Sequence, residues 1–222
     1  MVPFGKCLAW PVGFPPVIGL HLKIPIGLPY AIRMKLTPAS EQPRDHDGYR
    51  GEVTEAGVIG AATEDDLPGI VEILNHTAAN SIASFDTRPT SVAERREWFA
   101  RFSATGPYRL FVARRGEHVL GYAGSQRYRD HEAFRETVEV SVGLAVGARG
   151  QGVGTSLYRT LFACLADEPV HVALAGIAMP NDASVALHQK FGFTDVGTFR
   201  DYAVKNGRYL SSLWMQRLST AG

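Results

Sequence analysis

The chain has 222 residues, of which 45% are hydrophobic and 20% charged, enough for one globular domain with a full core plus an extension. Its 23 Lys and Arg nearly balance its 22 Asp and Glu, so a small-molecule substrate is expected rather than nucleic acid or an anionic membrane. Its two cysteines, Cys7 and Cys164, lie far apart and not at metal-ligand spacing, which argues against a disulfide framework or zinc site and favours a reducing compartment.

The N-terminal part of the chain differs in composition from the rest. Residues 1–33 are apolar, but prolines interrupt them, so no run approaches the roughly 20 residues of a membrane span. A histidine and a lysine within this stretch also argue against a signal peptide. Residues 37–55 are rich in Pro, Asp, Glu, Arg and Gly and predict a linker. We therefore expect a cytoplasmic protein with a poorly ordered Pro- and Gly-rich extension and linker over residues 1–56, Met34 being a second candidate start, and one domain over residues 57–222.

The apolar pattern becomes regular from residue 58, and residues 58–62 predict a short first strand. Thr63-x-x-Asp66 resembles a helix capping box in which Asp takes the place of Glu, so a first helix is expected to begin there and to end near Ala78. Aliphatic residues at helical spacing would form its buried face, namely Ile70, Val71, Ile73 and Leu74.

Ser91-x-x-Glu94 predicts the start of a second helix, whose neighbourhood would bring three aromatic side chains to the core, Trp98, Phe99 and Phe102. The apolar runs over residues 110–113 and 119–123 flank a polar turn, residues 114–118, that contains a glycine. This pattern predicts a hairpin of two antiparallel strands.

The remaining chain alternates strands and helices. We expect strands over residues 137–146, 170–178, 193–202 and 209–216, and helices over residues 156–165 and 182–191. No internal repeat or low-complexity segment interrupts this pattern. The expected order is β-α-α-β-β-β-α-β-α-β-β, which is an α/β fold with a mixed (α+β) sheet.

A glycine-rich loop, Arg149-Gly150-Gln151-Gly152-Val153-Gly154-Thr155, joins an expected strand to an expected helix. Glycines let the backbone approach a ligand, and the free N–H groups at a helix N-terminus attract phosphate, so the loop predicts a pyrophosphate-bearing ligand. A Walker loop would need a lysine before Thr155-Ser156, and a dinucleotide fingerprint would need glycine or alanine where Leu157 stands. Both of these phosphate loops are therefore disfavoured.

Arg149-x-x-Gly152-x-Gly154 resembles the acyl-CoA signature of the GNAT acetyltransferases, Gln/Arg-x-x-Gly-x-Gly/Ala. The segment Pro180-Asn181-Asp182-x-Ser184-Val185-x-Leu187-His188-x-x-Phe191-Gly192-Phe193 is similar to the second cofactor region of that family. The resemblance implies the GNAT acyl-CoA N-acyltransferase fold, acetyl-CoA as cosubstrate, and no metal. It assigns these residues to the cofactor: Val142, Gly143, Leu144, Arg149, Gly150, Gln151, Gly152, Val153, Gly154, Thr155 and Asn181.

Acetyl transfer to an amine needs a neutral nucleophile, but a lysine-like amine titrates at about 10 and is mostly protonated near neutral pH. A carboxylate or histidine within reach is therefore useful as a general base. Glu139 is the best candidate, because it lies on the strand that leads to the glycine loop. It precedes Val142-Gly143-Leu144, the stretch whose backbone should run beside the pantetheine of the cofactor.

Arg129-Asp130-x-x-x-Phe134-x-x-Thr137-Val138-Glu139-x-Ser141-Val142 is similar to a segment of the phosphinothricin and methionine sulfoximine N-acetyltransferases. This narrower resemblance implies a homodimer that acetylates a small amino acid analogue, such as phosphinothricin, methionine sulfoximine or methionine sulfone. It assigns Glu139 to the substrate amine and the region of Arg129, Asp130 and His131 to the substrate carboxylate. Phe85 would lie over the substrate side chain.

His188 stands where many GNAT enzymes carry a tyrosine that protonates the CoA thiolate, and where the phosphinothricin group carries a histidine proposed as base. Imidazole has an unperturbed pKa of about 6.5 and can serve as acid or base, and a structural role on a helix face is the third possibility. Asn181 would bind the pantetheine, cap the following helix, or do both.

Plainer structural roles are also possible, since Glu139 and Arg129 could be solvated and Phe85 could be a core ring. Two further functions use the same fold. In one, the acceptor is a polyamine, an antibiotic amine or a protein N-terminus. In the other, the protein binds acyl-CoA without turnover, which Glu139 and His188 argue against because a pure binder needs no base near the thioester. The physiological acceptor and the acyl-chain preference stay open.

Overall fold

A computed structural model of the protein describes residues 52–54 and 57–219. Its elements follow the chain as β1 (Glu52–Thr54), β2 (Gly57–Ala61), α1 (Leu67–Asn80), α2 (Val92–Phe99), β3 (Leu110–Arg115), β4 (His118–Arg127), β5 (Thr137–Leu144), α3 (Val153–Leu165), β6 (Val172–Met179), α4 (Asp182–Lys190), β7 (Thr194–Lys205) and β8 (Arg208–Leu218). Short 3-10 turns precede α1, β5 and α3. The expected α/β class and the order of elements from β2 onward are confirmed.

One strand lies where a linker was expected. Glu52–Thr54 pair with β2 in antiparallel register, Val53 opposite Val58. The prediction of a linker over residues 37–55 is therefore wrong at these residues, because they satisfy the backbone groups of the β2 edge. The rest of the predicted extension lies outside the described residues, and its boundary at residue 56 stays a prediction.

The strands form one sheet in the order β1-β2-β3-β4-β5-β6-β8-β7. Its neighbouring strands are antiparallel except β5 and β6, which run parallel. Parallel neighbours need a crossover, and α3 supplies it between β5 and β6. The predicted β3–β4 hairpin is confirmed, although β4 runs on to Arg127, and β7 and β8 form a second hairpin.

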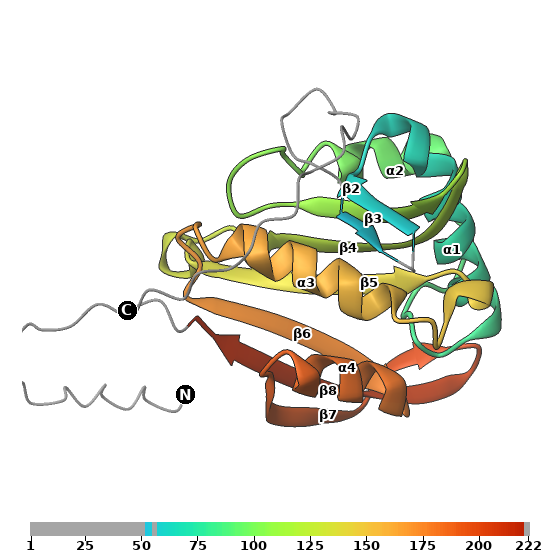
Figure 1. The fold of residues 1–222 in the computed structure, drawn as a ribbon. Helices are drawn as coiled ribbons and strands as arrows, with labels where there is room; N and C mark the ends of the chain where they lie inside the picture. The colour runs from blue at the N-terminus through green and yellow to red at the C-terminus, as the bar shows by residue number, and fades with distance from the viewer. Residues whose placement is uncertain (1–51, 55–56, 220–222) are drawn as a thin grey trace, which may run out of the picture. The chain divides into compact units, whose positions relative to one another are not determined.

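Helices cover both faces of the sheet (Figure 1). The core on the first face joins α3 to inward-pointing strand residues, among them Phe111, Val138 and Val140. The opposite face packs against α1 and α2 through a smaller cluster that includes Ile70, Leu110, Val112 and Tyr122. Side chains therefore alternate between the two helix layers along each strand, as the period of two requires.

The predicted capping boxes lie at the starts of the first two helical segments: Thr63 caps the 3-10 turn Glu64–Asp66 that runs into α1, and Ser91 caps α2. The Asp66 carboxylate accepts a hydrogen bond from the Thr63 N–H at 2.6 Å, and the Ser91 Oγ accepts one from the Glu94 N–H at 3.2 Å. Asp66 also accepts from the Arg114 Nε at 2.6 Å, across 48 residues of chain. The carboxylate thus joins the start of α1 to strand β3.

The parallel pairing in the middle of the sheet is short. It joins Thr137 to Val172, Val138 to Ala173 and Glu139 to Leu174, and the register ends there although both strands continue. Beyond Glu139, β5 keeps β4 as a neighbour and β6 keeps β8. Among the described residues, the sheet is therefore divided, toward the C-terminal ends of β5 and β6, into two halves whose strands do not pair with each other.

Asp66→Asn should lower the free energy of unfolding by about 2 kcal/mol, because a charge-assisted pair with Arg114 becomes a neutral one at a buried position. Urea unfolding of the variant and of Asp65→Asn, a neighbouring exposed carboxylate, measures the difference. Equal unfolding midpoints for the two variants would contradict the assignment of this contact.

Candidate active site

The open side of β5 carries backbone groups without a strand partner. The Val172 N–H donates to the carbonyl of Glu136, the residue before β5, at 3.1 Å. The backbone groups of even-numbered residues along this strand therefore point toward β6. Because that direction alternates, Val140, Val142 and Leu144 face the same side as Glu136. In the part of the chain that the structure describes, no strand pairs with them there. A ligand with amide groups is suited to bind them, since backbone groups away from water need partners.

Gly143, on the same strand, has a packing role. A Cβ at this position would lie 2.5 Å from a ring carbon of Tyr122 and 2.8 Å from its hydroxyl oxygen. Glycine therefore lets the buried Tyr122 ring pack against β5, and burial raises the pKa of Tyr122 to about 12.

The glycine loop leads into α3 with open space around its backbone. Gly150 and Gly152 have φ values of 75° and 79°, and nothing lies within 4 Å of a Cβ added to either. Gly152 is the N-cap residue and offers no side chain to the helix; the first α3 hydrogen bond runs from the Ser156 N–H to its carbonyl at 3.0 Å. The N–H groups before Ser156 therefore lack intrahelical acceptors and can bind an anion, namely those of Val153, Gly154 and Thr155.

Two predicted cofactor residues of this loop have exposed side chains. Gln151 donates its side-chain amide to the Gly147 carbonyl, which braces the loop from within. Arg149 has no ion pair among the described residues, so its guanidinium adds positive charge beside the helix N-terminus.

Glu139 occupies the last residue pair of the β5–β6 contact, opposite Leu174, with Gln126 of β4 on its other side. Its neighbours Val138 and Val140 are buried beneath α3, so alternation turns the Glu139 side chain to the other face. The side chain is half-buried, and no described group pairs with its carboxylate. Burial raises the pKa of Glu139 above its ordinary value, which makes the carboxylate a stronger base.

Aromatic rings hold Arg129 in the connection between β4 and β5. Its guanidinium carbon lies 5.0 Å from the ring centre of Tyr128 and 5.6 Å from that of Phe134. Tyr128 contacts Trp214 edge to face at 6.2 Å, and the Trp214 indole covers Gly176, where a Cβ would be 3.1 Å away. No described carboxylate forms an ion pair with Arg129, so its N–H groups are available to a carboxylate ligand.

The two residues after Arg129 make local contacts. Asp130 accepts a hydrogen bond from the Arg127 guanidinium at 2.6 Å, and a His131 ring nitrogen accepts one from the Ala133 N–H at 3.1 Å. Both side chains are exposed. They order the loop that carries Arg129, and their assignment to the substrate stays a prediction.

Phe85 lies in the connection between α1 and α2 and is 38% exposed, which excludes the alternative of a fully packed core ring. It meets Tyr202 of β7 edge to face at a ring-centre distance of 5.8 Å. Sequence reasoning missed Tyr202, and it also missed Tyr128 and Trp214. No local motif marks these residues, because they meet only through the packing of distant segments.

His188 is 3% exposed, and both of its ring nitrogens have partners. Nδ1 lies 2.7 Å from the Ser184 carbonyl oxygen, which can only accept, so Nδ1 carries the proton. Nε2 then accepts from the Tyr158 hydroxyl at 2.8 Å. Burial lowers the pKa of His188, which favours this neutral form. The geometry supports the structural role among the three that the sequence left open, and the acid or base role stays a prediction.

Asn181 caps α4, as the sequence allowed. Its Oδ1 accepts from the Ser184 N–H at 3.3 Å. The side-chain NH₂ makes no hydrogen bond with the described residues. It is available to a ligand beside the opening, which is the gap between β5 and β6 beyond Glu139. Capping and ligand binding are therefore compatible.

Within the described part of the chain, no three His, Cys, Asp or Glu side chains gather closely enough to hold a metal ion. Of the helices described, none combines the length and the apolar character needed to cross a bilayer.

Comparison with known proteins identifies the family to which a chain with this geometry is similar. The family model "Acetyltransferase (GNAT) domain" matches residues 58–194. A phosphinothricin N-acetyltransferase of Streptomyces coelicolor is 45% identical over 161 residues, covering 72% of this chain and 94% of the relative. A methionine sulfoximine/methionine sulfone acetyltransferase of Pseudomonas aeruginosa is 36% identical over 164 residues, covering 74% and 92%. The crystal structure of a phosphinothricin acetyltransferase from Sinorhizobium meliloti in complex with AcCoA superposes with a TM-score of 0.69 at 31% identity, covering 74% and 89%.

His188→Gln should change how stability depends on pH. Because burial lowers the folded-state pKa of His188 below the unfolded value of about 6.5, the unfolded chain binds more protons in acid. Stability from the neutral imidazole is therefore fully present above about pH 6.5 and is lost as the pH falls toward the lowered folded pKa. The variant should lack this acid-side loss, and at neutral pH it should be about 1 to 3 kcal/mol less stable, because the glutamine amide does not reproduce both ring contacts, with the Ser184 carbonyl and with the Tyr158 hydroxyl.

Urea unfolding between about pH 5 and pH 8 measures both effects, the pH range bracketing the ordinary histidine pKa. His118→Gln, at an exposed hairpin position, is the matched control and should follow the wild type. A wild-type curve parallel to that of His188→Gln would show that His188 does not titrate as a buried neutral group.

Proposed function

Since the chain belongs to the GNAT acetyltransferase family, we propose that it transfers the acetyl group of acetyl-CoA to the primary amine of a small amino acid analogue. The acceptor class is that of phosphinothricin, methionine sulfoximine and methionine sulfone. One observation carries the proposal: the half-buried, unpaired carboxylate of Glu139 lies where β5 and β6 separate, beside the open backbone of β5.

The open backbone and the glycine loop suit the two ends of the cofactor. The N–H groups at the start of α3 would bind the pyrophosphate, and the unpaired groups of Val142 and Leu144 would bind the amides of the pantetheine. The thioester would then lie near Glu139, where the pairing of β5 with β6 ends. Asn181 lies at the start of α4, on the β6 side of the same opening, and could bind the pantetheine with its side-chain NH₂.

Glu139 would take a proton from the ammonium group of the acceptor, directly or through water, and so release a neutral amine. The amine nitrogen attacks the thioester carbon, forming a C–N bond and an oxyanion that a free β5 N–H group can stabilise. The oxyanion collapses, the C–S bond breaks, and the second nitrogen proton goes to the departing thiolate. The products are the N-acetyl compound and CoA, and the mechanism needs no proton from His188.

Arg129 supports an amino acid as acceptor. Its guanidinium is held between Tyr128 and Phe134, and its N–H groups are free to bind a substrate carboxylate. The relatives are named for acetylation of amino acid analogues, which carry such a group.

We also propose a cytoplasmic homodimer. Support for it comes from apolar side chains that β7 leaves exposed, among them Val196, Phe199 and Val204, since large apolar patches mark interaction sites.

Glu139→Gln should lower acceptor-dependent thiol release from acetyl-CoA by about 100-fold or more, the usual contribution of a general base. The wild-type rate at limiting acceptor should rise with pH as Glu139 loses its proton, and this acid limb should lie above the ordinary glutamate range because burial raises the pKa. The assay uses phosphinothricin or methionine sulfone as acceptor, with a reaction lacking acceptor as blank.

Glu117→Gln, an exposed carboxylate in the β3–β4 turn, is the matched control and should keep full activity. Thiol release by Glu139→Gln at the wild-type rate would reject Glu139 as base. Acetyl-CoA binding by the wild type without release for either acceptor would reject the acceptor class and favour another amine or a binding-only module.

A further inference from the structure

The connection between α1 and α2 is tied to the other end of the chain by one buried side chain. Lys205, the last residue of β7, is 4% exposed, and its Nζ donates to the carbonyl oxygens of Ser81 and Ser84, each at 2.8 Å. These contacts span more than 120 residues of sequence. No described carboxylate forms an ion pair with the ammonium group, so its described partners are backbone carbonyls of this one connection.

The two carbonyl oxygens that accept these hydrogen bonds lie where a cation is favoured. Ser81 is the C-cap residue of α1, a helix of 14 residues, and the C-terminal end of a helix carries partial negative charge. The ammonium group therefore gains from the helix dipole and from two charge-assisted hydrogen bonds. A neutral side chain of the same length would fill the space without holding the two carbonyls.

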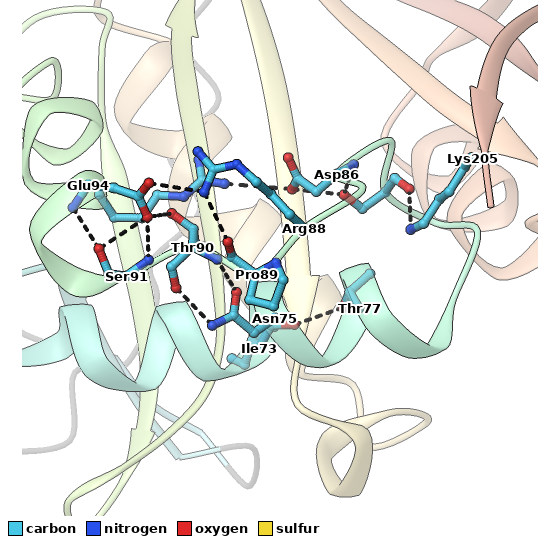
Figure 2. A network of polar contacts seen from close by, with 12 residues as sticks. Ile73, Asn75, Thr77, Asp86, Arg88, Pro89, Thr90, Ser91, Glu94 and Lys205 are labelled. Carbon is cyan, nitrogen blue, oxygen red and sulfur yellow. Dashed lines mark hydrogen bonds and ion pairs between the residues drawn. The ribbon is translucent and has the colours of Figure 1, made fainter.

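The connection itself is braced from within, as Figure 2 shows. The Asn75 side chain exchanges two hydrogen bonds with the backbone of Thr90, at 2.8 and 2.9 Å. Ser84 and Asp86 bond to each other in both directions, at 2.9 and 3.0 Å, and Asp86 forms an ion pair with Arg95 at 3.6 Å. Because these contacts tie the connection together internally, Lys205 is expected to act on its position as a unit.

The tie crosses the opening of the sheet. The connection follows α1, which belongs to the half that ends at β5, whereas Lys205 belongs to the half formed by β6, β8 and β7. Among the described strands, pairing joins these halves only from Thr137 to Glu139, at the closed end of the opening. Lys205 joins them again at the other end, where β6 and β7 finish, and the edge-to-face contact of Phe85 with Tyr202 lies at the same crossing.

We propose that Lys205 is a positioning residue of the acceptor site. Its ammonium group fixes the α1–α2 connection across the opening, so that Phe85 is held over the place where the acceptor side chain binds. This inference rests on the proposed function. It assigns Lys205 no contact with the reacting atoms, and it predicts an effect on acceptor binding that is separate from binding of the cofactor.

Lys205→Met keeps the unbranched shape and most of the length of the side chain and removes its charge and hydrogen-bond donors. In the full-length protein it should raise the KM for methionine sulfone about tenfold or more, leave the Kd for acetyl-CoA within about twofold, and change kcat much less than KM, since an interaction of about 1.4 kcal/mol is worth a factor of ten. Lys205→Arg, which keeps the charge and donors, should recover a part of the affinity. Lys190→Met, an exposed lysine on α4, is the control and should behave as wild type.

Phe85→Ala makes the test independent of the folding of the lysine variant, because Phe85 is already part-exposed. It should raise the acceptor KM by a similar factor, and the double variant should be no worse than the poorer single one, since both act through one contact. If Lys205→Met does not fold, the same cycle is run with Lys205→Arg.

An unchanged acceptor KM in an active, folded Lys205→Met would overturn the proposal, and so would an equal weakening of acceptor and acetyl-CoA binding, which marks a general support of the fold. Fully additive effects of the two substitutions would also overturn it. A wild-type enzyme without acceptor-dependent thiol release would instead reject the proposed function, whatever the lysine variants do.

Discussion

The pairing of β5 with β6 lasts from Thr137 to Glu139, and most of the site depends on where it stops. Continuous pairing would satisfy the backbone groups of Val140, Val142 and Leu144 and leave none of them to bind a ligand. Because the two strands separate, their facing edges have no strand partners although they lie in the middle of the sheet. Unpaired backbone groups are costly there unless a ligand satisfies them. The cofactor is thus expected to complete a hydrogen-bonding pattern that the sheet leaves unfinished.

An open sheet must still be held at a fixed width. On the first face α3 and α4 pack over the junction, and the buried Tyr158–His188 hydrogen bond connects these two helices. On the other face Lys205 connects the α1–α2 connection to β7. Two buried polar contacts therefore brace the opening from both sides. Glu139 lies between them and is half-buried by the junction, which explains why its pKa is raised.

Local patterns allowed the sequence to predict most of the fold. Capping boxes gave the starts of the first two helical segments, and the glycines gave the loop between β5 and α3. The face of the sheet that Glu139 occupies follows instead from the observed burial of Val138 and Val140. The expected cofactor stretch at Val142 also lies on the open edge of β5.

The contacts that sequence reasoning missed share one property, which is distance along the chain. Arg114 reaches Asp66 over 48 residues, His188 reaches Tyr158 over 30, and Lys205 reaches Ser81 over 124. No periodicity or motif encodes such pairs, because each depends on how separate elements pack. For that reason the sequence left the role of His188 open and gave no sign of Lys205.

Amide hydrogen exchange of β5 with and without acetyl-CoA, followed by NMR residue by residue, measures whether the unpaired edge of β5 holds the cofactor. Acetyl-CoA should slow exchange at Val142 and Leu144 and at the start of α3. The amide of Val138, which lies within the β5–β6 pairing, should change little. Equal exchange at Val142 and Leu144 in the two states, at a cofactor concentration that saturates the protein, would show that the unpaired edge of β5 does not hold the cofactor.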